Sequence, residues 1–332
     1  KSATSNVGID FTLFNSRLTG SLDWYRKVST DLLFTTRIDP SEGFTSQIIN
    51  NGGLVNNGIE LMLNYNWVKP TSKGGLAWSS MLSLSHNKNK INYVDAVSVL
   101  PAQLVGGGYK VGYPVNSLFS YQYKGLNNVG QPQWLKADGT LTTVALTGSD
   151  LGAVTYSGGT DPVNVIGLTN TVYFKGFSLN VLIMYYGGQY MRANAPDVYQ
   201  SGAAYGGMPS YLLKSWTPGN TTTNIPGFGQ YAPGNYAGTS VVPSGYLPNS
   251  DAFVQAADFI KIRSAVLGYQ LPQRWTNKLG AKNVQLTFQL NNPKALWVKN
   301  DAGIDPETIN PVTGVGGARV PTSYVLGLNF NL

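Results

Sequence analysis

The chain contains no cysteine, which excludes disulfide bonds, thiol catalysis and thiolate metal sites together. Its one histidine, His86, lies in an Asn- and Lys-rich stretch just beyond a predicted strand, and we interpret it as a surface residue because the sequence offers no partner ligands. No nucleophile–base pair, metal cluster or cofactor loop is recognisable either. The sequence therefore predicts a protein that is not an enzyme and has no metal or cofactor.

Charge is also scarce, because only 12% of the residues are charged, about half the share typical of soluble domains. No run of about eighteen apolar residues occurs, which excludes a helical membrane span. The net charge of +7 is scattered, with Arg26-Lys27 and Lys88/Lys90 at strand ends. Nucleic-acid binding would need these cations clustered on one face, so they fit contacts with interfaces and lipid headgroups better.

The chain does show a regular alternation of apolar with small or polar residues. In the segment Ser323 to Leu332, large apolar side chains occupy every second position, and small or polar residues lie between them. A strand places successive side chains on opposite faces. One apolar face and one weakly charged polar face suit a wall between lipid and a wet lumen. The pattern predicts an all-β, transmembrane antiparallel β-barrel; a soluble all-β sandwich remains the alternative.

Nine segments show this pattern strongly. They are Asn6 to Phe14, Leu18 to Lys27, Gly58 to Val68, Leu76 to His86, Gly167 to Lys175, Phe177 to Gly187, Phe259 to Leu271, Val284 to Asn291 and Ser323 to Leu332. A tenth candidate, Ser117 to Gly125, would make the number of membrane crossings even and so break the strict alternation of short and long connectors. We therefore place it in a small extracellular sheet within a long connection.

The connectors alternate between short and long, as in outer-membrane barrels with short periplasmic turns and long extracellular loops. The short ones are Asn15 to Arg17, Lys69 to Gly75, Lys175-Gly176 and Pro272 to Asn283; the long ones are Val28 to Asn57, Asn87 to Ile166, Gly188 to Asp258 and Asn292 to Thr322. Nine strands leave two unpaired edges, whereas single-chain bacterial barrels normally have an even number. The chain also begins without a signal peptide. We expect it to be part of a longer polypeptide.

Aromatic residues concentrate near the predicted strand ends, as the two interfacial girdles of a membrane barrel require. Those next to short turns are Trp67, Trp78, Phe174, Phe177 and Trp275, and those before long loops are Trp24, Tyr25, Tyr185 and Tyr186. Their distribution favours girdles over isolated core packing.

Several ordered stretches carry a family resemblance. They include Asn6 to Leu18 (NVGIDFTLFNSRL), Asn50 to Leu61 (NNGGLVNNGIEL), Gly125 to Pro132 (GLNNVGQP), Tyr173 to Leu179 (YFKGFSL), Leu213 to Thr217 (LKSWT), Ala257 to Arg263 (ADFIKIR), Leu267 to Pro272 (LGYQLP) and Asp305 to Glu307 (DPE). Over these stretches the chain resembles the C-terminal barrel of SusC/RagA-type TonB-dependent outer-membrane transporters of the Bacteroidetes. The chain departs from the family in ending on Asn331-Leu332 rather than on an aromatic residue, and in having Asn291-Asn-Pro-Lys294 after its penultimate strand.

The resemblance implies that residues 1–332 are the C-terminal part of a TonB-dependent receptor barrel, contributing the last nine of 22 strands, with the plug and N-terminal domains absent from this chain. It also implies active import of oligosaccharides or peptides across the outer membrane. A SusD-like surface lipoprotein and the TonB complex would be the partners, with outer-membrane lipid around the wall.

Candidate substrate contacts lie in or near the long loops, where aromatic rings can stack on sugars or peptide side chains and an arginine can pair with a carboxylate. They are Tyr121, Tyr123, Tyr190, Arg192 and Trp216. For any single one of them, we favour the alternative that it only stiffens a loop or meets the lipoprotein. We interpret Gly52-Gly53 and Asn56-Asn57 as setting a turn before a strand, and Asp305-Pro-Glu307 as a local turn with a salt bridge.

Two other functions stay open at this point. A passive outer-membrane channel or adhesin barrel would lack energy coupling, and a soluble carbohydrate-binding β-sandwich would need no detergent for extraction. No residue pattern distinguishes a glycan from an oligopeptide as the transported solute.

Overall fold

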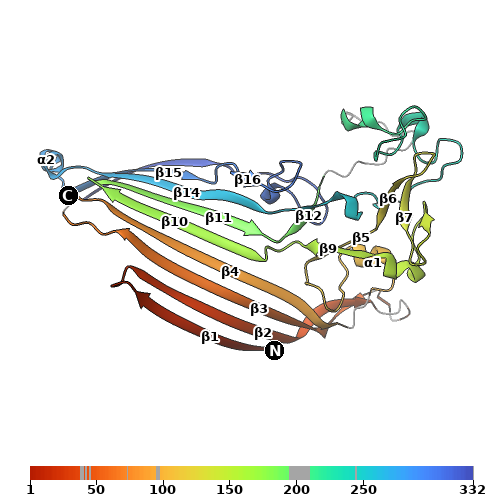
Figure 1. Ribbon diagram of the computed structural model, residues 1–332, viewed down its shortest axis with the longest axis horizontal. Helices are drawn as coiled ribbons and strands as arrows, with labels where there is room; N and C mark the ends of the chain where they lie inside the picture. Colours follow the sequence, from red (N-terminus) through yellow and green to blue (C-terminus); the bar gives the residue numbers. More distant parts are fainter. Residues whose placement is uncertain are drawn as a thin grey trace.

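A computed structural model describes residues 1–37, 41, 43–44, 46–72, 74–94, 98–193, 210–243 and 245–331. Its main feature is one antiparallel sheet in which successive long strands lie side by side (Figure 1). The order is β1 (Ser2–Leu13), β2 (Leu18–Arg37), β3 (Ser46–Val68), β4 (Ala77–Val94), β10 (Asn164–Phe174), β11 (Phe177–Gly187), β14 (Phe259–Gln270), β15 (Asn283–Asn291) and β17 (Ser323–Asn331). All nine predicted crossings are therefore confirmed, although Leu332 lies outside the described residues.

The remaining elements lie in the connectors. β16 (Trp297–Val298) pairs with β14, and three small sheets consist of β5 (Ser117–Ser120) with β9 (Thr155–Gly159), β6 (Tyr123–Leu126) with β7 (Pro132–Leu135) and β8 (Leu141–Thr142), and β12 (Tyr190–Arg192) with β13 (Val254–Ala256). The helices are α1 (Pro101–Val105) and α2 (Gln273–Thr276), with 3-10 turns η2 (Gly148–Ala153), η3 (Ser210–Lys214), η4 (Gly229–Tyr231), η5 (Asp251–Phe253), η6 (Asn277–Leu279) and η7 (Pro306–Thr308). The tenth candidate strand lies off the main sheet, as predicted: its residues form parts of β5 and β6, which belong to two of the small sheets.

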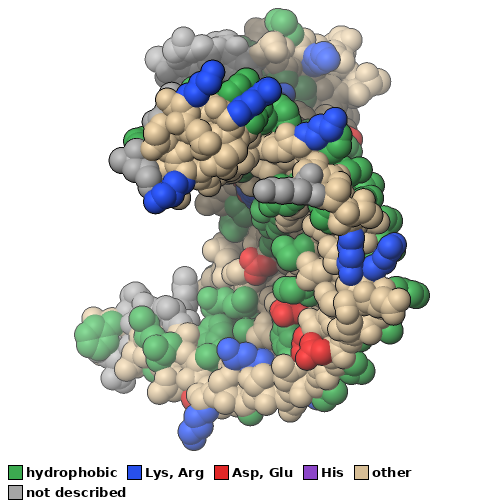
Figure 2. Space-filling view, turned by 90° about the vertical axis from the view of Figure 1, so that its left-hand side faces the viewer, with side chains coloured by type: hydrophobic (Ala, Val, Ile, Leu, Met, Phe, Trp, Pro, Cys, Tyr) green, Lys and Arg blue, Asp and Glu red, His purple; other side chains and the backbone are tan. Residues whose placement is uncertain are grey.

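The register aligns the apolar side chains of neighbouring strands in continuous rows on one face. One row runs Ile9, Leu22, Leu61, Leu84, Ile166, Tyr185 and another Val68, Trp78, Val172, Leu179, Leu267, Phe288, Leu326. We call this the apolar face. The opposite, polar face includes Asp10, Asp23 and Glu60, with Asp23 opposite Glu60. Seen along the strands, the sheet curves into a C with acidic side chains on its concave side (Figure 2).

Two strands are much longer than expected. The predicted loop from Val28 to Asn57 is mostly paired strand, with Val28 opposite Val55 and Arg37 opposite Ser46. The alternation is interrupted there by a bulge between Ser29 and Leu32, where Asp31 has a φ of 56°. Such a bulge shifts the side-chain period and hides the strand from a pattern search.

The glycines in this region correct our interpretation of a turn. Gly52 and Gly53 lie inside β3, and a Cβ at Gly52 would overlap the ring of Phe34. Phe34 belongs to a small buried cluster with Ile91 and Val94. Glycine is therefore needed at position 52 for the close approach of a side chain rather than for a turn. In the same way, β4 continues to Val94 and includes His86, whose Nδ1 lies 2.7 Å from Asn164 Oδ1.

One girdle of aromatic residues is visible at the short-turn end of the apolar face. Trp67 stacks on Trp78 with ring centroids 5.3 Å apart, and their indole nitrogens donate to Ser80 and Asn170. Phe177 packs on Tyr269 at 4.4 Å. At the other end Trp24 and Tyr185 share the apolar face, but the register places Tyr25 and Tyr186 on the polar face, so these two do not belong to a lipid-facing girdle.

Candidate functional site

The largest buried core among the described residues lies outside the main sheet, at the end of the long connectors (Figure 1). It combines residues 104–154 of the β4–β10 connector with Val242, Tyr246 and Leu247 of the β11–β14 connector. We call these two connectors together the loop layer. Tyr246 stacks on Tyr121 at 3.8 Å, and its hydroxyl accepts a hydrogen bond from the Leu146 amide at 2.7 Å. The loop layer is therefore a packed unit built from segments about 100 residues apart in the chain.

Tyr121 and Tyr123 belong to this core. Tyr121 is buried against Tyr246, and Tyr123 is half-buried beside Trp134, with its hydroxyl donating to the Asn224 carbonyl at 3.2 Å. Burial raises the pKa of both tyrosines above the ordinary value. Both hydroxyls therefore stay protonated, and contact between a solute and Tyr121 would require the loop layer to open.

Arg192 is also buried, with 1% of its surface exposed. Its guanidinium donates to the carbonyls of Phe119 at 2.6 Å and Val312 at 3.1 Å, so it ties β12 to β5 and to the β15–β17 connector. Burial lowers the pKa of Arg192 to about 10, which leaves the group charged at neutral pH. In this geometry it binds backbone oxygens rather than a solute carboxylate.

Trp216 packs in a separate aromatic cluster with Tyr231 and Tyr236, at centroid distances of 6.2 and 5.5 Å. Its ring covers Gly130, where a Cβ would lie 2.5 Å away. This contact joins the two connectors a second time. Solute contact by Trp216, which is 2% exposed, stays a prediction.

Tyr190 is the member of the predicted set that lines a cavity. Tyr190 as a whole residue is 39% exposed, and it borders a space of about 910 Å³, which we call the rim cavity. The lining comes from β3, β4, β9, β12 and the stems of two connectors, and includes Asn57, Asn87, Lys88, Tyr156, Ser157 and Asp161. A volume of this size accommodates a drug-sized or small oligomeric ligand.

Two oxygen atoms in the lining of the rim cavity are buried with no hydrogen-bond partner among the described residues. They are Asn87 Oδ1 and Ser157 Oγ. Buried polar atoms are normally paired in native proteins, and a hydroxyl or amide of a ligand would supply the missing donor. Sequence reasoning missed Tyr156 and Ser157 because the short strand β9 has only five residues.

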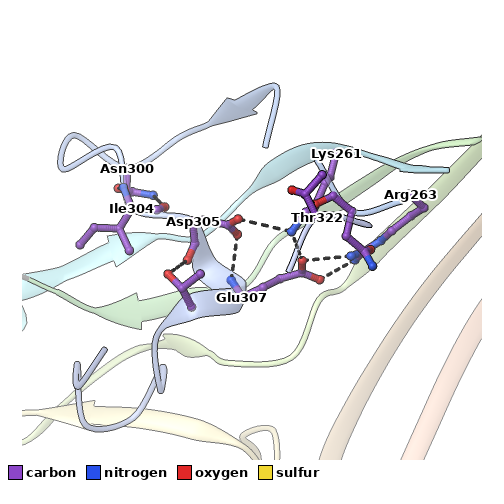
Figure 3. A network of polar contacts seen from close by, with 9 residues as sticks. Lys261, Arg263, Asn300, Ile304, Asp305, Glu307 and Thr322 are labelled. Carbon is purple, nitrogen blue, oxygen red and sulfur yellow. Dashed lines mark hydrogen bonds and ion pairs between the residues drawn. The ribbon is translucent and has the colours of Figure 1, made fainter. Parts of the chain in front are cut away.

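A cluster of charged side chains lies where the β15–β17 connector meets β14 (Figure 3). Lys261, 1% exposed, contacts Glu307 at 2.5 Å and Asp305 at 3.3 Å, and Arg263 forms a bidentate pair with the same Glu307. The interpretation of Asp305-Pro-Glu307 as a turn with a salt bridge is confirmed. The two basic residues lie within a stretch that carries the family resemblance, but no local pattern indicates their role.

Protonation of Glu307 should release this connector. Burial by itself would raise the pKa of Glu307, but the hydrogen bonds donated by Arg263 and Lys261 outweigh it and hold the pKa below its ordinary value. The stabilisation is therefore present above the ordinary pKa of roughly 4.3 and lost as the pH falls through the lower folded value. We expect hydrogen exchange of residues 299–315 to rise sharply only below about pH 4.

Replacing Glu307 by Gln should have the same effect at pH 7, at a cost of about 3 kcal/mol, because Lys261 stays buried with a weakened partner set. Asp301→Asn is the matched control, since Asp301 is an exposed acid in the same connector. Equal exchange in the two variants would contradict the assignment of Glu307 as the anchor.

With the geometry established, comparison with known proteins becomes informative. No protein-family model matches the chain. TonB-dependent receptor P26 of Formosa agariphila is 27% identical over 98% of this chain, and TonB-dependent receptor SusC of Bacteroides thetaiotaomicron is 26% identical over 99%. TonB-dependent receptor P3 of Formosa agariphila is 25% identical over 91% of this chain. The resemblance to SusC-type receptors is confirmed.

Solved structures support the fold. The RagAB peptide transporter and its closed-closed state superpose with TM-scores of 0.73 and 0.74, over 99% of this chain, at 21% identity. The match confirms the fold class, and together with the named relatives it confirms the outer-membrane location. The match excludes the alternative of a soluble all-β sandwich. The chain spans about a third of the length of these relatives, from 30% to 35%. Among the described residues, no helix is long and apolar enough to cross a bilayer.

Proposed function

We propose that this chain forms part of the wall and the extracellular rim of an outer-membrane importer driven by the TonB complex. The observation that carries the proposal is the nine-stranded sheet with one apolar face, which shares its fold with the RagAB transporters over nearly its whole length. The sequence relatives named TonB-dependent receptors add the mode of energy coupling. Transport rather than catalysis is the activity that fits these relatives.

The two edges of the sheet support a larger barrel. In the part of the chain that the structure describes, β1 pairs only with β2, and β17 pairs only with β15. Unpaired backbone groups in hydrocarbon cost several kcal/mol each. We propose that both edges pair with further strands, and that the closed barrel has 22 strands with a plug and N-terminal domains encoded outside residues 1–332.

The loop layer is the proposed docking surface for a SusD-like lipoprotein. Its buried core makes it a preformed surface, and it exposes large apolar side chains: Leu141, Val144, Leu213 and Val241 are between 48% and 90% exposed. These four side chains are the proposed apolar anchors for the partner, since an apolar protein interface needs such side chains gathered on one surface.

Oligosaccharides or peptides are the proposed solutes, with Tyr190 and Tyr156 as the most accessible contacts in the rim cavity. The tyrosine rings offer stacking surfaces, and the unpaired Asn87 and Ser157 oxygens offer acceptors for ligand hydroxyl or amide groups. The buried candidates Tyr121, Arg192 and Trp216, and the half-buried Tyr123, would act by holding the rim in shape.

Uptake measurements test the proposal. Cells that carry the intact receptor should accumulate a labelled oligosaccharide or oligopeptide, and inactivation of TonB should abolish uptake while the receptor remains in the membrane. Tyr190→Ala should weaken uptake, whereas Val320→Ala, an exposed apolar residue of the β15–β17 connector outside the loop layer, serves as a control. Uptake that persists without TonB would favour the passive channel instead.

The orientation of the barrel can be tested separately. An epitope inserted near Gly234, an exposed turn glycine with a φ of 94°, should bind antibody on intact cells. The same epitope in the short turn between β3 and β4 should bind antibody only after permeabilisation. The reverse pattern would invert the topology.

A further inference from the structure

Three cations lie on the apolar face: Arg26 in the middle of β2, and Lys88 and Lys90 near the loop-layer end of β4. The register places Arg26 of β2 opposite Asn57 of β3, and Asn57 opposite Lys88 of β4. Two of the cations and Asn57 therefore form one row across three strands. Lys90, opposite Val55, lies on the same face in the next row. All three cations are exposed. Lys27, by contrast, alternates to the polar face.

This row directly follows the edge of the apolar band. The neighbouring row on the same face contains Val7, Trp24 and Ile59, which are 66%, 44% and 44% exposed. A tryptophan at this position is typical of the boundary between hydrocarbon and headgroups. Arg26 and Lys88 therefore lie at the depth where lipid headgroups begin. Arg26 faces lipid, whereas Asn57, Lys88 and Lys90 share this face of the sheet and also line the rim cavity.

The described part of the chain provides these cations with no counterion. Among the residues that the structure describes, no carboxylate forms an ion pair with Arg26, Lys88 or Lys90, whereas Lys261, Arg263 and Lys299 are all paired. Arg26 and Lys88 flank Asn57 at a Cα separation of about 10 Å, because neighbouring strands lie about 5 Å apart. Their long side chains can converge on a group above the Asn57 amide, and two cations with an amide donor suit a phosphate.

We propose that Arg26, Asn57, Lys88 and Lys90 form a binding site for the phosphate-bearing headgroup of an outer-leaflet glycolipid. Charge complementarity selects an anionic headgroup, and the adjoining apolar rows provide a surface for its acyl chains. The proposal depends on the outer-membrane location and on the extracellular position of the loop layer. It does not depend on solute import, so either proposal can fail without the other.

Lipid binding by the purified, detergent-solubilised receptor tests the site. The probes are bisphosphorylated lipid A and the same lipid with its phosphates removed. The wild type should prefer the phosphorylated form by about tenfold or more, on the scale of charges at a membrane surface. Arg26→Gln combined with Lys88→Gln should lose this preference and leave binding of the dephosphorylated lipid unchanged. Raising NaCl from about 0.05 to 0.5 M should reduce the preference in the wild type.

Two controls separate this site from a general electrostatic attraction and from binding in the rim cavity. Arg274→Gln combined with Lys278→Gln removes the same charges at the short-turn end and should keep the preference. Tyr190→Ala alters the rim cavity, which Lys88 and Lys90 also line, and should keep it too. Loss of the preference in either control, or its survival in the Arg26/Lys88 variant, would overturn the assignment. So would a wild type that binds both lipids equally.

A crosslinking measurement decides the matter if the double variant does not fold. The chain contains no cysteine, so Asn57→Cys can carry a unique photoreactive group within it. Phosphorylated lipid A should crosslink there several-fold more than at Asn170→Cys, a position on the same face near the short turns. Equal crosslinking at the two positions would contradict the site.

Discussion

Replacing Val181 by Arg should destabilise the barrel by about 2–4 kcal/mol, the cost of a basic side chain near the bilayer midplane. Val181 lies on the apolar face of β11, between Asn170 of β10 and Ala265 of β14. To take its charge out of the hydrocarbon, the introduced arginine side chain would have to displace these neighbours. The loss can be measured as a shift in urea unfolding of the receptor in lipid vesicles, followed by its heat-modifiable migration.

Asn180→Arg is the matched control, because the same charge one residue away faces the polar side. It removes one hydrogen bond to Thr171, of 2.8 Å, and should therefore cost only about 1 kcal/mol. Equal losses in the two variants would show that β11 does not separate lipid from water.

Replacing Trp134 by Ala should unfold the loop layer and leave the membrane sheet assembled. Trp134 is fully buried, and its ring packs against Tyr121, Tyr123 and Tyr246 at 6.3, 5.6 and 5.3 Å. Truncation of a buried tryptophan costs about 3–5 kcal/mol. Hydrogen exchange should increase throughout residues 104–154 and 242–247, and binding of the lipoprotein partner should weaken.

Leu141→Ala provides the comparison, since Leu141 is 48% exposed in the neighbouring strand β8 and its truncation should change stability by less than about 0.5 kcal/mol. A Trp134→Ala receptor with unchanged exchange in the β11–β14 connector would show that the two connectors do not fold as one unit.

The membrane sheet could be predicted from sequence because its rule is local. The alternation of Leu179, Val181 and Ile183 with Ser178 and Asn180 follows from a strand that faces two media, and each strand repeats it. The same rule failed where the period shifts: the bulge at Asp31 concealed the second half of β2 and the first half of β3. It also failed at Tyr25 and Tyr186, because a position near a strand end does not define the face.

The candidate site was harder to predict, because it depends on contacts between distant segments. Tyr121 and Arg192 have the chemistry of solute contacts, but Tyr246 and the carbonyls of Phe119 and Val312 occupy their functional groups. Nothing in the local sequence indicates those partners. The predicted solute contact of Tyr190 stays a prediction; its ring lies at a cavity wall, and Tyr156 joins it there only through the fold.

The central claim is that this sheet is a wall between lipid and a watery lumen, and β11 offers the most direct measurement. Single cysteines at positions 178 to 183 of this otherwise cysteine-free chain can carry spin labels in the receptor reconstituted in vesicles. Lipid-dissolved quenchers should act strongly on labels at 179, 181 and 183, and water-soluble quenchers on labels at 178 and 180. If the label at 180 responds to the lipid-dissolved quencher as strongly as the label at 181, the wall and its register are wrong.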